Sequence, residues 1–111
     1  MKRLSRDDIL NAKDIEQKEV EIKEWGGSVL VQTLSALKRS DIMDSCMDDK
    51  GKMSIKQLYP ALMIAGCVEP KLEKADVDAL NAKSSKAIEK VCKVIMELSG
   101  ITEDDIQTEK N

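Results

Sequence analysis

Residues 19–35, EVEIKEWGGSVLVQTLS, decide the fold of this chain. Two β-prone runs flank Gly26 and Gly27, and a Gly-Gly pair supplies the positive φ angles that a two-residue hairpin turn requires. With these two glycines as the turn, the sequence predicts an antiparallel hairpin in which Ile22 faces Val31.

The predicted hairpin has one apolar and one polar face, because side chains alternate along a strand. The apolar face consists of β-branched residues, namely Val20, Ile22, Val29, Val31 and Thr33. Trp25 lies at the hairpin tip, and we expect it to pack partly against a helix, since a short hairpin needs a large anchor. A lone hairpin is only marginally stable in water, so helices from the rest of the chain must cover its apolar face.

Helix start and stop signals divide the rest of the chain into about five helices. Ser5, Ser35 and Ser84 stand where N-cap residues are expected, and Gly66 and Gly100 where helices end. The expected helices cover residues 6–12, 36–47, 55–65, 72–82 and 85–99. The sequence therefore predicts an α+β fold that is mainly helical, with one N-terminal β-hairpin.

The length of 111 residues is enough for one domain with a modest core. We expect this single domain to cover residues 1–101. Residues 48–52 (DDKGK) are predicted to form a turn and residues 68–71 (VEPK) a connector, because Pro70 keeps Glu69 out of the helical region. The acidic, polar segment 102–111 is predicted to be a flexible tail.

Two helical segments carry more apolar surface than a domain of this size readily buries. Residues 58–68 are apolar almost all round, and the apolar residues of 88–98 cover an arc of about 200°. A helix that is apolar on every side is ordinarily buried in its own domain, and the alternative is that one flank contacts a partner. The partner-binding candidates are Leu58, Met63, Ile64, Val94 and Met96.

The residue inventory offers no catalytic site. The chain contains no histidine, so a Ser-His or Cys-His pair is excluded, and no glycine-rich loop leads a strand into a helix to hold phosphate. Cys46, Cys67 and Cys92 are far apart and lack a C-x-x-C spacing, which favours buried free thiols over a disulfide or zinc site. We therefore expect no enzymatic activity and no cofactor.

The acidic turn at residues 48–58, DDKGKMSIKQL, superficially suggests an EF-hand loop. With Ile55 at the central hydrophobic position, Lys50 and Lys52 occupy the third and fifth ligand positions, and Tyr59 stands where a bidentate glutamate belongs. Lysine cannot replace a carboxylate around Ca²⁺, so no calcium site is predicted.

The hairpin stretch resembles that of the XkdN-like phage tail assembly chaperones. Those small proteins open with a short helix, place EWGG in a hairpin and continue as helices. The matching motifs occur here in the same order, as LSRDDILNA at 4–12, EWGG at 24–27, VEPKL at 68–72 and IMELSGI at 95–101. The resemblance covers most of the chain, from Leu4 to Ile101.

The resemblance implies a protein that acts during assembly of a phage or prophage tail. Such proteins bind the long, aggregation-prone tape-measure protein, keep it soluble and help recruit tail-tube subunits. They act in the host bacterial cytoplasm and are not expected in the mature particle. The absence of an apolar run near 18 residues and of a secretory apolar region at the N-terminus agrees with a cytoplasmic location.

Two alternatives remain from other classes of protein. Short helices joined by a turn can form a DNA-binding regulatory domain, but the net charge of −3 and the mixed surface provide no basic patch. A structural tail component would remain in purified particles, whereas a chaperone would leave them.

Overall fold

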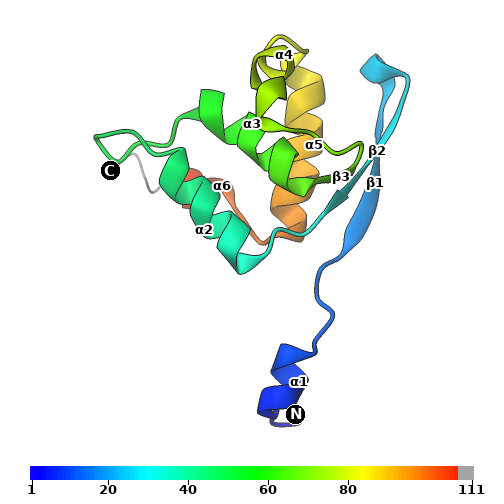
Figure 1. The fold of residues 1–111 in the computed structure, drawn as a ribbon, viewed down its shortest axis with the longest axis vertical. Helices are drawn as coiled ribbons and strands as arrows, with labels where there is room; N and C mark the ends of the chain where they lie inside the picture. Colours follow the sequence, from blue (N-terminus) through cyan, green and yellow to red (C-terminus); the bar gives the residue numbers. More distant parts are fainter. Residues whose placement is uncertain (108–111) are drawn as a thin grey trace.

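A three-stranded antiparallel sheet in the order β1-β2-β3 lies along one side of a group of helices (Figure 1). The computed structural model describes residues 1–107. The strands are β1 (Gln17–Ile22), β2 (Gly27–Gln32) and β3 (Cys67–Glu69). The helices are α1 (Arg6–Leu10), α2 (Ala36–Ser45), α3 (Ile55–Gly66), α4 (Val77–Asn81), α5 (Ser85–Leu98) and α6 (Glu103–Gln107), with short 3-10 turns η1 (Lys23–Trp25) and η2 (Lys74–Asp76). The fold is therefore α+β, as predicted.

The hairpin forms, but the predicted pairing of Ile22 with Val31 is wrong. Val20 pairs with Val29 and Ile22 with Gly27, which moves the register by four residues. The chain turns through η1, and of the two glycines only Gly26 has a positive φ, of 71°. A 3-10 turn closed by one left-handed glycine needs no second positive φ, which leaves Gly27 free to begin β2.

The predicted apolar face is nevertheless the core face of the sheet. A register shift by an even number of residues leaves every side chain on its original side. Val20, Ile22 and Val31 are buried, and Val29 packs against the core. Helix α5 contacts β1 and β2 on one side and α3 on the other, so it forms the centre of the domain.

Serine caps begin three of the helices at the predicted residues. The Ser5 hydroxyl accepts the Asp8 N–H at 3.1 Å while the Asp8 carboxylate accepts the Ser5 N–H at 3.0 Å, which makes a capping box. The hydroxyls of Ser35 and Ser84 accept the N–H groups of Lys38 and Ala87 at the starts of α2 and α5. These bonds satisfy backbone donors that have no partner within the helix.

Gly66 was predicted to follow the helix as its C-terminal stop, but it is the last residue of α3. Its φ is not in the left-handed region, and Cys67 follows in extended conformation. An added Cβ at Gly66 would lie 2.7 Å from Cδ1 of Ile95 in α5. Glycine is therefore required by the close approach of α3 to α5, and not by the turn of the chain.

Two elements were missed by the sequence analysis. The expected connector overlaps β3, which pairs with β2 through Val31 and Cys67. The expected flexible tail contains α6, which begins with Thr102 N–H donating to the Asp105 carboxylate at 2.8 Å. Ile106 of α6 is buried in the core, and residues 108–111 of the predicted tail lie outside the described residues.

A hydrogen bond and an ion pair connect α2 and the residue before its cap to the C-terminal part of the chain. The Leu34 N–H, just before α2, donates to the hydroxyl of Ser99 at the end of α5, at 2.8 Å. Arg39 of α2 forms an ion pair with Asp105 of α6 at 3.5 Å. The position of α2 thus depends on residues more than sixty positions later.

Candidate binding groove

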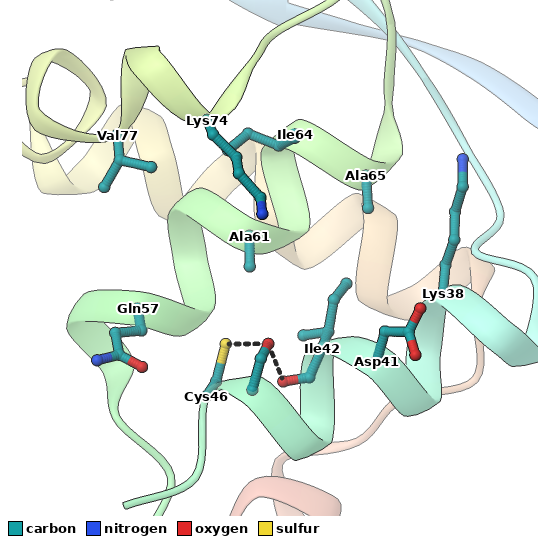
Figure 2. A pocket seen from close by; sticks show the side chains of 11 residues that line it. Lys38, Asp41, Ile42, Cys46, Gln57, Ala61, Ile64, Ala65, Lys74 and Val77 are labelled. Atoms are coloured by element: carbon teal, nitrogen blue, oxygen red, sulfur yellow. Dashed lines mark hydrogen bonds between the residues drawn. The ribbon is translucent and has the colours of Figure 1, made fainter.

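An open groove of about 630 Å³ lies between α2 and α3 (Figure 2). One wall comes from α2 and the residue that follows it, and consists of Lys38, Asp41, Ile42, Ser45 and Cys46. Ile42 and Cys46 are one helical turn apart and are both buried, so they form the apolar base of this wall. Apolar residues of α2 and of the position that follows it therefore contribute to the groove.

The opposite wall comes from α3 and from the η2–α4 segment. It consists of Gln57, Ala61, Ile64, Ala65, Lys74 and Val77. Ala61 and Ala65 are four residues apart, so they lie on one face of α3, and Figure 2 shows both methyl groups directed toward the α2 side. Because both side chains are small, they leave the space between α2 and α3 unfilled.

Charged groups stand at the edges of the groove. Lys38 and Asp41 are exposed on α2, and the exposed Lys74 extends from η2 toward Ala61 (Figure 2). An apolar floor with a charged rim is the arrangement that receives an amphipathic helix, whose apolar side enters the groove while its polar side stays in water.

The thiols provide no reactive group in this groove. Burial is the main reason that the pKa of Cys46 lies above its ordinary value, although the neighbouring Ser45 hydroxyl opposes the shift. Burial also raises the pKa of Cys67 to about 11 and raises the pKa of Cys92. All three thiols are free and buried, as predicted, and they stay protonated at neutral pH.

Within residues 1–107, no three histidine, cysteine or acidic side chains gather closely enough to hold a metal ion. None of the helices in this described part of the chain is long and apolar enough to cross a bilayer. The groove is therefore described by shape, apolar surface and rim charge alone.

The predicted partner-binding residues do not form one surface. Leu58 and Met63 are 1% and 2% exposed and belong to the core, so assigning them to a partner surface was wrong. Both belong to the hydrophobic core cluster, and neither lines the groove. Ile64 is half-buried and lines the groove. Val94 and Met96 are half-buried on α5, and Met96 lines a separate hollow beneath α6.

The remaining groove residues were not among the predicted candidates. In the sequence, Ala61, Ile64 and Ala65 are simply part of a helix that is apolar on nearly every side. The pairing of α3 with α2, which is not visible in the sequence, determines which side of α3 remains open. The signal available in the sequence was the small size of Ala61 and Ala65, one turn apart.

Trp25 at the hairpin tip is 37% exposed and is thus mostly covered. It lines a hollow of about 410 Å³ together with Met63 of α3 and Leu80 of α4. Trp25 belongs neither to the buried core nor to the partly buried residues packed against it, so its packing against a helix stays a prediction.

Comparison of the chain with models of protein families, with curated proteins and with solved structures gives no match.

Proposed function

We propose that this protein is a non-enzymatic phage or prophage tail assembly chaperone that holds an apolar helix of the tape-measure protein in the groove between α2 and α3. The observation that carries the proposal is the groove itself, an open apolar channel of about 630 Å³ with charged edges. A chain without histidine and with fully protonated thiols is suited to binding and not to catalysis.

The motifs that carry the resemblance occupy positions that shape this fold. EWGG forms the end of η1 and the start of β2, where Gly26 supplies the positive φ of the turn. The closing motif supplies Ser99, which fixes the chain before α2, and Gly100, whose φ is 69°. The motifs therefore support the relationship through the fold, and the groove supplies the binding surface.

The client chemistry follows from the groove walls. Ile42, Ile64 and Val77 offer branched apolar side chains, while Ala61 and Ala65 leave room for large ones from the client. A client helix with leucine-sized residues at i, i+3, i+4 and i+7 satisfies this shape. Covering such a stripe keeps an otherwise aggregating helix in solution, which is the task of a tape-measure chaperone.

In this proposal the protein acts in the host cytoplasm, binds the tape-measure protein, helps recruit tail-tube subunits, and leaves before the particle is complete. No contact with nucleic acid or membrane is involved. A structural tail component would instead be present in purified particles, so particle composition separates the two.

Co-expression with the tape-measure protein encoded in the same tail gene cluster tests the proposal. Ala61→Glu places a charge in the apolar floor, where an unpaired charge is costly, and should leave the client insoluble. Leu37→Glu is the matched control, because Leu37 is 70% exposed on α2 and does not line the groove. Thermal melts of the purified variants establish that both are folded.

Equal solubilisation of the client by the parent, Ala61→Glu and Leu37→Glu would exclude the groove as the client site. Loss of solubilisation by both variants would mean that the client surface extends beyond the groove onto the exposed face of α2. If Ala61→Glu is unfolded, Lys74→Glu at the exposed rim changes the groove charge without entering the floor and gives the same comparison.

A further inference from the structure

The first fifteen residues form an arm that leaves the body of the protein. None of residues 1–19 is buried. Five of the eight large hydrophobic side chains that are exposed in the described residues belong to this arm, namely Met1, Leu4, Ile9, Leu10 and Ile15. Figure 1 shows α1 well separated from the other helices.

The arm contains helix α1, none of whose residues is buried against the rest of the chain. Helix α1 has five residues, and isolated helices shorter than about 12 residues are marginal in water. Its capping box joins only Ser5 and Asp8, three residues apart, and covers no apolar side chain. A surface outside the chain is needed to cover Leu4, Ile9 and Leu10.

The base of the arm is fixed to the sheet. Thr33 N–H donates to the Glu16 carbonyl at 2.9 Å, and Glu16 N–H donates to the Thr33 hydroxyl at 3.0 Å. The radius of gyration is 15.3 Å, whereas a compact chain of this length has about 13 Å. The arm therefore starts from a fixed point and extends away from its own groove, into space that a second molecule can occupy.

We propose that, when no client helix fills it, the α2–α3 groove of one copy receives the arm of a second copy. The arm presents apolar residues on a short helix, and the groove presents an open apolar floor. In a reciprocal exchange each copy contributes the fifteen arm residues and the eleven groove-lining residues, or 26 residues in all. Stable interfaces use about 20–30 residues on each side.

Charge favours the same arrangement. The arm carries Lys2, Arg3, Arg6 and Lys13 against Asp7, Asp8 and Asp14, so its side chains have a net charge of +1. The whole chain has −3, which leaves −4 on residues 16–111. Opposite net charges attract the arm and the body at long range. The groove edge itself carries Lys38 and Lys74 against Asp41, so apolar contact and not charge selects the groove as the docking site. A two-fold exchange satisfies both copies with the same contact.

The proposal is tested on the full chain by sedimentation equilibrium, without any tape-measure protein. Concentrations from about 1 to 100 µM cover weak to moderate affinities. We expect the parent to reach twice the chain mass of 12.4 kDa. Ile9→Glu in the arm and Ala65→Glu in the groove should each raise the dissociation constant by about 30-fold or more, as interface hot spots do.

A mixture of the two variants gives the sharper test. Ile9→Glu retains an intact groove and Ala65→Glu retains an intact arm, so mixing them should restore a dimer held by one arm in one groove. Leu37→Glu is the matched control and should leave the parent dimer unchanged, because Leu37 is an exposed apolar residue like Ile9 but belongs to neither surface. If Ala65→Glu does not fold, Asp41→Lys at the exposed rim should weaken the dimer by repelling the basic arm.

A parent that stays monomeric throughout this range overturns the proposal. So does a mixture that stays monomeric, or a Leu37→Glu variant that dissociates as readily as Ile9→Glu. A monomer in which Ile9→Glu changes the hydrogen exchange of groove amides would mean that the arm occupies its own groove. None of these outcomes depends on client binding, so failure here is distinct from failure of the chaperone proposal.

Discussion

Gly66→Ala is expected to destabilise the protein, although alanine is ordinarily the better helix former. The added Cβ would lie 2.7, 2.8 and 2.9 Å from Cδ1, Cγ2 and Cγ1 of Ile95. Ile95 is fully buried, so its side chain has no free space into which to move. Three contacts this short require the backbones of α3 and α5 to separate.

The magnitude follows from two opposing terms. Overpacking a well-filled core costs about 1–3 kcal/mol. The gain from replacing glycine is at most about 1 kcal/mol, and it is smaller here because Gly66 is the last residue of α3. We therefore expect a net loss of about 1–2 kcal/mol, which corresponds to about 4–8 °C in Tm for a domain of this size.

Urea denaturation followed by circular dichroism measures this loss. Gly27→Ala is the matched control, because a Cβ at Gly27 meets nothing within 4 Å, and its effect should stay within about 0.5 kcal/mol. Ile95→Val removes Cδ1, so Gly66→Ala should cost less in that background than in the parent. A Gly66→Ala variant as stable as the parent would refute the close-packing explanation.

Two further predictions concern the core and the C-terminal helix. Met63→Ala should cost about 2–4 kcal/mol in urea denaturation, because Met63 is 2% exposed, whereas the half-buried Met96→Ala should cost less than half as much; equal costs would mean that Met63 is not a core residue. Hydrogen bonds from Thr102 hold the pKa of Asp105 below its ordinary value of 3.8, so its contribution to stability is complete above pH 3.8 and is lost as the pH falls below it. Asp105→Asn should therefore lower Tm at pH 6 and have a smaller effect at pH 3, and an equal effect at both would contradict this account.

The sequence was sufficient for the hairpin, its core face and most helix positions. The register was mispredicted because a Gly-Gly pair fits a two-residue turn as well as it fits the end of a 3-10 turn. Since the two registers differ by four residues, Val20, Ile22 and Val31 were assigned to the core correctly in spite of the error.

The binding groove could not be predicted, because it depends on how the helices pack. Leu58 and Met63 are as apolar as Ile64, and the packing of the other elements around α3 decides which of them is covered. The elements missed were those without a periodic signal. Strand β3 has three residues, and α6 has Ile106 as its one apolar residue within an acidic segment.

Two long-range contacts of α2 bear on when the groove can form during protein synthesis. They are the hydrogen bond between Leu34 and Ser99 and the ion pair between Arg39 and Asp105. Both walls of the groove are complete in the chain by Val77, yet the contacts of α2 include Ser99 and Asp105, which are synthesised later. Helix α5, against which α3 packs, also comes late. A nascent chain that ends before Ser99 lacks the hydrogen-bond partner of the Leu34 N–H, so we expect the groove to take its final shape only after α5 has been synthesised.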